Sequence, residues 1–504
     1  MRKEVKSPFL PIHKLSTRRA LFLSLAQRYV GLTIYIVSTM ILARLLKPEE
    51  IGIFSLCAAV TAIAGTLRDF GISEYIIQER ELTRDRLRAA YGLAIVTAWT
   101  LALIVFLLRS PLAAYYGEPG LRVVLAVLTL NFLLLPLASP AFAVLTREMK
   151  FSAIFVIQTA AALTQAVTSI ALAWRGFSYM SLAWAGVAAN VVQIFGTAFF
   201  RPREAWLLPG FKEWKRVWSY GSRVSGATLL HEISRNAYEF IIAKQLGFAA
   251  LGLYNRAIGL MSQFHQNITS AILRVAHPSF AATSRAGRDM VPEYTRALAY
   301  FTGVAWPFFA FVAVMSREVI EVLFGHQWLE AAPLARILAV SSMIYSTWAL
   351  APSLLAALGE ARRKLRIQLF LTPAAIGITV LASLHSLEAV AYGAVISSVI
   401  ALMLHGDQLR QVIGLRVMHV LYACGASAKV TLVCFAIAVA ASKLVAVLLV
   451  NPLLQVLWVG CWVGVGWIGG LFLFSHPLRT ELSTVWSSVR RYRLLGVGRD
   501  EPDK

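Results

Sequence analysis

The chain has few charged residues, and few of those are acidic. Only 15% of its 504 residues are charged, and 26 Asp and Glu stand against 48 Lys and Arg. Hydrophobic residues make up 58% of the chain, and the mean hydropathy is +0.66. A soluble domain needs more charge than this to cover its surface. The composition therefore excludes an ordinary soluble protein and predicts a polytopic membrane protein.

Cysteine is scarce, and motifs for metals or nucleotides are lacking. The 4 cysteines have no CxxC spacing and fall in or beside apolar segments, so we expect neither a disulfide nor a metal site. They are Cys57, Cys424, Cys434 and Cys461. The sequence contains no Walker loop, so we expect no ATP coupling within the chain and no cofactor. The basic N-terminal segment has no apolar centre, which predicts that the first span itself directs insertion.

Long apolar runs are abundant, each near the twenty or so residues that cross a hydrocarbon core. Barrel strands would give short alternating segments instead, so we predict an all-α polytopic membrane protein with about 14 transmembrane helices. A count of 12 or 13 fits the same pattern. The predicted spans lie near residues 21–45, 51–77, 89–108, 121–145, 153–173, 178–200, 217–243, 249–277, 293–315, 333–357, 366–384, 388–405, 424–450 and 453–475.

The net charge of +22 comes from basic residues placed mostly between the apolar runs. If every second loop is cytoplasmic, these clusters all fall on one side, as the positive-inside rule requires. The clusters are Arg2–Arg19, Arg80–Arg88, Arg147–Lys150, Arg201–Arg216, Arg285–Arg288, Arg362–Arg366 and Arg479–Arg493. We therefore expect a multi-pass protein with both termini in the cytoplasm. Loops this short do not build a basic groove, so we expect no nucleic-acid partner.

Two sequence matches indicate an internal duplication. Ile41–Phe54 aligns with Ile241–Tyr254, with 4 identical positions in 14. A second match at nearly the same offset pairs Pro140, Glu148, Lys150 and Gln158 with Pro352, Glu360, Arg362 and Gln368. A repeated unit of six spans restores its starting side, which predicts two parallel six-helix bundles around a central cavity. The predicted domains are residues 1–205, residues 206–420, and residues 421–504 with two additional spans and a basic tail.

The seventh predicted span is unusually polar. A charge near the bilayer centre costs about 2.5–3.5 kcal/mol on insertion scales, so such side chains must face protein or water. The span carries Arg223, His231, Glu232, Arg235, Asn236 and Glu239. One interpretation is a salt-bridge network between Arg235 and Glu232 or Glu239 that holds the bundles together. The other is a cavity wall that meets a polar substrate or a coupling cation.

Further polar residues occur in three other spans. Within the spans, arginines outnumber acidic residues. A guanidinium group binds phosphate oxygens in bidentate fashion, so this surplus favours an anionic substrate. Nearby amides suit sugar hydroxyls. The predicted substrate-binding residues are Arg28, Arg68, Arg223, Arg235, Arg256, Arg274, Gln263 and Asn267. The predicted ion-coupling residues are Asp69, Glu232, Glu239 and His231. For Arg256 and Arg274 the alternative is that they reach opposite membrane interfaces.

At these positions the chain resembles the polysaccharide (Wzx-like) flippases of the multidrug/oligosaccharidyl-lipid/polysaccharide exporter superfamily. The resemblance rests on Ile41–Phe54, on Asp69 with Gly71, on Leu251–Ala257, and on His277 with Pro278. It extends to the expected architecture of two six-helix bundles plus two trailing helices.

The resemblance implies transport and no enzymatic activity. Its cargo would be an undecaprenyl-diphosphate-linked oligosaccharide, moved by alternating access across a bacterial inner membrane for capsule, exopolysaccharide or O-antigen synthesis. It also implies that Arg28 and Arg68 in the first bundle, and Arg256 and Arg274 in the second, hold the diphosphate. Arg28 has no basic counterpart at Thr228, so the bundles are not equivalent. The lipid bilayer is the expected environment, and polysaccharide polymerase and export proteins are candidate partners.

Three other functions remain open. A peptidoglycan-precursor flippase of the same superfamily would differ in its cargo. A cation-coupled drug exporter should favour an acidic cavity, contrary to the surplus of arginine. A membrane glycosyltransferase or polymerase needs catalytic side chains on large outward loops, and the most substantial outward loop here runs only from about Arg317 to Glu330.

Overall fold

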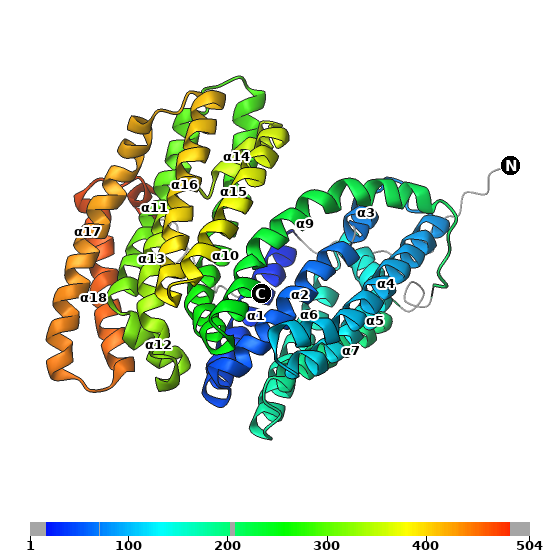
Figure 1. Ribbon diagram of the computed structural model, residues 1–504. Helices are drawn as coiled ribbons and strands as arrows, with labels where there is room; N and C mark the ends of the chain where they lie inside the picture. The colour runs from blue at the N-terminus through cyan, green and yellow to red at the C-terminus, as the bar shows by residue number, and fades with distance from the viewer. Residues whose placement is uncertain (1–16, 70, 202–206, 484–504) are drawn as a thin grey trace, which may run out of the picture. The chain divides into compact units, whose positions relative to one another are not determined.

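A computed structural model describes residues 17–69, 71–201 and 207–483, and every regular element there is a helix, as predicted (Figure 1). The helices are α1 (Thr17–Leu45), α2 (Pro48–Asp69), α3 (Ile72–Gln78), α4 (Arg84–Tyr116), α5 (Gly120–Arg147), α6 (Phe151–Trp174), α7 (Met180–Phe200), α9 (Trp214–Gln245), α10 (Phe248–Arg285), α11 (Val291–Val314), α12 (Ser316–Phe324), η1 (His326–Trp328), α13 (Ala331–Trp348), α14 (Ala351–Ala357), α15 (Ala361–Ser383), α16 (Leu387–Ile413), α17 (Val417–Leu448) and α18 (Pro452–Leu473).

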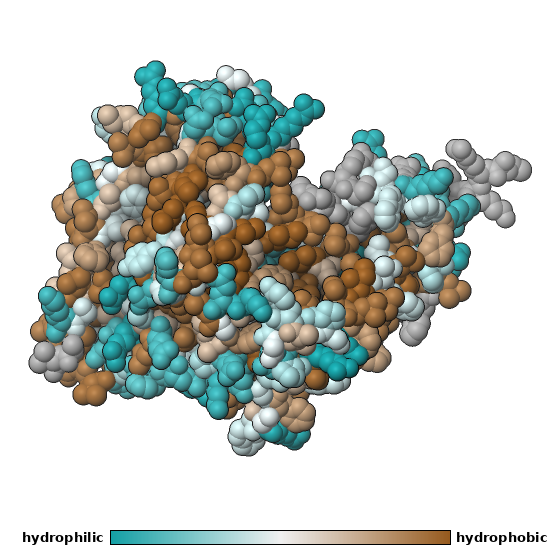
Figure 2. Space-filling model, in the orientation of Figure 1, coloured by the Kyte–Doolittle hydropathy of each residue, from teal (hydrophilic) through white to brown (hydrophobic). Residues whose placement is uncertain are grey.

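Twelve of the described helical segments are long and apolar enough to cross a membrane. Helices α9 and α10 have 32 and 38 residues, so their length suffices, but their many polar residues lower the hydropathy and keep them outside that group. The count of 14 spans thus stays a prediction. Apolar side chains gather over the sides of the helices and polar ones toward their ends (Figure 2). Exposed apolar side chains in this number are what lipid contact requires.

The chain folds into two compact units. The first contains residues 1–46 and 56–233, and the second contains residues 47–55 and 234–504. The chain changes unit three times: between α1 and α2 after residue 46, within α2 after residue 55, and within α9 after residue 233. The predicted boundary after residue 205 lies outside the described residues, and the three-part division of the chain stays a prediction.

The first unit packs α4 against α5, α6 against α7, and α1 against α6. Small residues allow these helices to approach closely: Ala89, Ala90 and Ala94 on α4 are buried beside Ile76. Helix α4 begins where the Thr83 hydroxyl accepts a hydrogen bond from the Arg86 amide at 3.3 Å, so side chains as well as composition set the helix limits.

The second unit packs α11 against α17 and α13 against α16, and α18 lies beside α17 (Figure 1). Tryptophan side chains join helices through backbone carbonyls: Trp306 Nε1 donates to Met343 O at 2.9 Å, and Trp467 Nε1 donates to Gly303 O at 2.8 Å. The two final helices share a buried apolar cluster with α11 and α12. They are therefore an integral part of this unit.

Two glycines from the duplicated segments make a reciprocal contact within the second unit. Gly52 on α2 lies against the carbonyl group of Phe248, and Gly252 on α10 lies against the carbonyl group of Pro48. Gly52 aligns with Gly252 in the repeat, and Pro48 aligns with Phe248. Such an exchange of contacts between aligned positions is expected of a duplicated unit arranged about an axis. It brings two backbones together without room for a Cβ atom.

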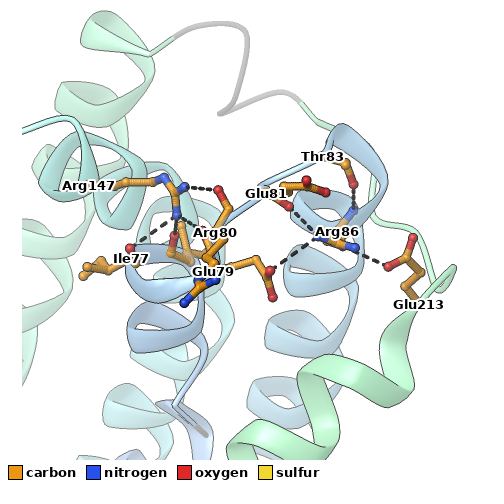
Figure 3. Close-up of polar contacts among 9 residues, drawn as sticks. Ile77, Glu79, Arg80, Glu81, Thr83, Arg86, Arg147 and Glu213 are labelled. Atoms are coloured by element: carbon orange, nitrogen blue, oxygen red, sulfur yellow. Dashed lines mark hydrogen bonds and ion pairs between the residues drawn. The ribbon is translucent and has the colours of Figure 1, made fainter. Parts of the chain in front are cut away.

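Arg147 joins the end of α5 to the end of α3 in the first unit (Figure 3). Its Nη1 donates to Ile76 O at 2.7 Å and to Glu79 O at 2.5 Å, and its Nη2 donates to Arg80 O at 3.4 Å. Ile76 belongs to the last turn of α3 and Glu79 and Arg80 follow it, where helix carbonyls lack partners within the helix. A cation there also complements the negative end of the helix dipole.

We expect Arg147→Gln to lower the free energy of unfolding by about 2 kcal/mol, because the loss of the charged guanidinium leaves several carbonyl groups without a hydrogen bond. The melting temperature of the purified protein would measure the loss. Arg80→Gln is the matched control: that arginine contributes only its carbonyl to the contact, so its side chain should be replaceable without a comparable effect. Equal melting temperatures for native protein and Arg147→Gln would contradict the assigned role.

Candidate functional site

The first unit contains a small polar cavity of about 270 Å³ between α2, α5 and α7. Most of its wall is apolar, as expected inside a membrane bundle, but four polar side chains reach it. Its lining residues are Ala58, Thr61, Ala62, Arg68, Leu128, Asn131, Phe132, Leu135 and Asn190. A cavity this size accommodates part of a polar headgroup and not a whole oligosaccharide.

Arg68 supplies the positive charge of this cavity from the last turn of α2. Its Nε and Nη2 donate to Asp69 Oδ1 at 2.9 and 2.7 Å, and its guanidinium carbon lies 5.4 Å from the centre of the Phe132 ring. The side chain of Arg68 is 18% exposed and that of Asp69 is 62% exposed. Of the five N–H donors of arginine, Asp69 takes two, and Nη1 bonds to none of the described residues. The edge of the guanidinium carrying Nη1 is thus available to an anion.

Two asparagines form the uncharged polar part of the cavity. Asn190 Nδ2 donates to Asn131 Oδ1 at 2.8 Å, which joins α7 to α5. Each amide keeps a further hydrogen-bonding group for a ligand. Sequence reasoning did not select either residue. A signal existed, because each is a lone amide within an apolar span and too short to reach the interface.

The second unit buries a carboxyl group on α9. Glu239 is 8% exposed, and its Oε2 bonds to none of the described residues. The Tyr238 hydroxyl donates to Asn255 Oδ1 at 2.9 Å and lies 3.3 Å from Glu239 Oε1. Glu239 forms no ion pair with Arg235 among the described residues, and Arg235 is exposed. A buried carboxyl with an unbonded oxygen suits a proton or a small cation.

Arg256 packs against aromatic rings of its own unit. Its guanidinium carbon lies 5.3 Å from the centre of the Phe324 ring and 5.1 Å from that of Trp328, which is fully buried. This geometry stabilises a half-buried cation and joins α10 to α12 and η1. Packing and substrate binding are therefore equally good explanations for an arginine at position 256.

The other predicted residues come from helices α1, α9 and α10. Asn267 Nδ2 donates to Gln263 O at 2.8 Å along its own helix, and both side chains are half-buried. Arg274 is exposed, whereas Arg28 and Glu232 are half-buried. The side chains of Arg223 and His231 lie outside the described residues. In the first unit, Arg68 and Asp69 are two predicted residues that contact each other.

The chain matches a family model described as "Polysaccharide biosynthesis protein" over residues 41–333. It is 23% identical over 320 residues to the lipopolysaccharide biosynthesis protein WzxC of Escherichia coli, covering 62% of this chain and 64% of that protein. It is 24% identical over 314 residues to the succinoglycan biosynthesis transport protein ExoT of Rhizobium meliloti, covering 61% of this chain and 62% of ExoT. The chain thus spans somewhat under two thirds of the length of these curated relatives.

Solved structures show the same fold. One is the lipid II flippase MurJ in an inward closed conformation, with a TM-score of 0.69, 11% identity, and 92% of this chain and 99% of MurJ covered. Another is an inward-facing multidrug resistance transporter of the MATE family, with a TM-score of 0.62 and 15% identity. The match covers 76% of this chain and 94% of that transporter. At such identities the likeness concerns the fold alone. Because the family match covers more than half of a chain with this helical membrane fold, the chain belongs to the polysaccharide biosynthesis protein family.

Proposed function

We propose that the protein is a flippase, without enzymatic activity, that moves an undecaprenyl-diphosphate-linked oligosaccharide across the bacterial inner membrane. The cavity around Arg68 is the observation that carries the proposal. It offers a guanidinium edge for a phosphate and two amides for hydroxyl groups, and apart from Thr61 its other lining residues are apolar. The names of the relatives, which concern lipopolysaccharide and succinoglycan, support a saccharide cargo.

The physics of the substrate explains why such a cavity is needed. A diphosphate cannot cross hydrocarbon unaided, whereas a polyprenyl tail can stay in lipid while the headgroup passes through a polar path. With the cytoplasm negative and both termini on that side, outward movement of each negative charge is favoured by about 2.3 kcal/mol per 100 mV. Alternating access by two bundles would carry the headgroup, and Glu239 is a candidate for ion coupling.

The same observations weigh against one of the two alternatives in this superfamily. A drug exporter that handles cations would be hindered by Arg68, because its guanidinium repels a positive ligand. A peptidoglycan-precursor flippase shares the chemistry of the headgroup, so only the cargo distinguishes it. Polymerase and export proteins remain proposed partners that would receive the product outside.

Deleting the gene tests the proposal through the lipid that accumulates. We expect cells without the protein to accumulate a complete lipid-linked repeat unit on the cytoplasmic side and to lose surface polymer. Mass spectrometry of extracted lipids would identify the unit, and expression of the protein should restore export. Accumulation of lipid II with arrested wall growth would instead support the peptidoglycan alternative. Unchanged lipid-linked saccharides in deleted cells would refute both.

A further inference from the structure

Four aromatic rings form a row inside the second unit, with a histidine at each end. His265 comes from α10, Tyr345 and Trp348 from α13, and His405 from α16. The ring centres are separated by 4.6 Å from His265 to Tyr345, 4.7 Å from Tyr345 to Trp348, and 4.6 Å from Trp348 to His405. The last two rings stack with an interplanar angle of 15°. The row thus connects three helices through direct ring contacts.

His405 is buried and His265 is half-buried, and among the described residues both lack hydrogen bonds that an imidazole normally makes. Neither nitrogen of His265 bonds to a described residue, nor does Nδ1 of His405, a residue that is 4% exposed. The indole nitrogen of Trp348 has no partner among the described residues either. Leaving a buried polar group unbonded costs about 1–3 kcal/mol, and a phenylalanine would fill the same space without that cost. Packing alone therefore does not account for histidine at these two positions.

Among the residues that the structure describes, the printed contacts of the His265 ring are with aromatic rings. Phe301 and Phe309 of α11 flank His265, with ring centres at 6.5 and 5.0 Å, and Tyr345 is the titratable group that faces it from α13. On α10 itself the nearest charged residues are Arg256 and Arg274, each nine residues away.

Around His405 the charged groups have other partners. Asp407, two residues later on α16, accepts a hydrogen bond from Gln411 Nε2 at 2.7 Å. From α15, Arg363 Nη1 donates to Gln411 Oε1 at 3.0 Å. Among the described residues no carboxylate or guanidinium bonds to either imidazole ring. A charge arriving on the row would therefore be held by the rings themselves.

We propose that His265 and His405, with the two rings between them, form a proton-binding site in the second unit. An imidazolium stacked on an indole face is stabilised by a cation–π interaction, and the stack of His405 on Trp348 has that geometry. Protonation would add a donor and a positive charge in a low-dielectric interior, which changes the packing preferred by α10, α13 and α16. The proton-binding site is argued from these ring contacts alone. The coupling of proton binding to transport rests on the proposed function.

Proton binding can be measured without any cargo. The full-length protein, labelled with ¹³C-histidine and purified in detergent, contains 9 histidines, and His265→Gln and His405→Gln each remove one resonance and so assign it. We expect both assigned resonances to shift as the pH is lowered from about 8 to about 4, because each imidazole then takes up a proton. Trp348→Phe should lower the midpoint for His405, because a phenyl ring is a weaker cation–π partner than an indole.

The controls separate a proton site from a structural role. His326→Gln removes an exposed histidine and should leave the two assigned titrations unchanged. A midpoint for His405 that Trp348→Phe does not alter, in protein that elutes as native, would overturn the role of the stack. Resonances of His265 and His405 that stay constant across the whole range would overturn the site itself.

Transport gives the second measurement. In proteoliposomes loaded with lipid-linked oligosaccharide, we expect a pH gradient to accelerate flipping by native protein. His265→Gln and His405→Gln should flip at the rate that native protein shows without the gradient. Equal stimulation of native and substituted proteins would overturn coupling at this site. A protein that titrates but flips no oligosaccharide would instead refute the proposed function and leave the proton site standing.

Discussion

Replacing Arg68 with glutamine should abolish polymer export while the amount of protein in the membrane stays unchanged. Its guanidinium is the only charged group that lines the described cavity of the first unit, and the edge carrying Nη1 is open to a phosphate. Losing a charge-assisted bond to a desolvated diphosphate removes about 3–5 kcal/mol of binding, which lowers export more than a hundredfold. Folding should change little, because the Asp69 carboxylate left behind is 62% exposed.

Surface polymer and membrane abundance should be measured together in complemented deletion cells. Arg109→Gln is the matched control, because this arginine also lies on an aromatic ring of the first unit, 3.6 Å from the centre of Phe106, yet does not line the cavity. Arg68→Lys should retain part of the activity, since an ammonium keeps the charge but not the planar fork. Normal export by Arg68→Gln at normal abundance would remove this residue from the mechanism.

Replacing Gly52 or Gly252 with alanine should prevent correct folding of the second unit. A Cβ atom at Gly52 would overlap the backbone of Phe248, and one at Gly252 would overlap the backbone of Pro48. Backbone atoms cannot turn aside as a flexible side chain does, so the cost should be at least about 3 kcal/mol. In an ordinary helix the same change is favourable by about 1 kcal/mol, so the expected sign is the reverse of helix propensity.

Gly259 provides the control on the same helix as Gly252. No atom lies within 4 Å of the position that its Cβ would occupy, so Gly259→Ala should preserve or raise stability. The measurements are the yield of monodisperse protein in size-exclusion chromatography and its melting temperature. Native-like yield and melting temperature for both Gly52→Ala and Gly252→Ala would show that the close approach is not needed for folding.

Sequence reasoning reached the candidate site only in part. Arg68 and Asp69 were selected as charged residues within a predicted span, for phosphate binding and ion coupling, and the two side chains bond to each other. Asn131 and Asn190 were missed because they are 59 positions apart, so that only folding places them at one cavity. Arg256 shows the opposite case. Its charge led to the prediction that it binds substrate, whereas its contacts with aromatic rings are explained by packing.

The sequence by itself determined that this is an all-α membrane protein, with the apolar runs as helices and the signs of a duplication. The reason is that helix length and hydropathy are local quantities, and backbone groups in lipid must be bonded within their own segment. Tertiary structure alone decided which polar residues meet: Asn131 with Asn190, Gly52 with Phe248, and the row from His265 to His405. Those contacts depend on how helices distant in sequence are rotated against one another. That rotation is fixed only when the helices pack together.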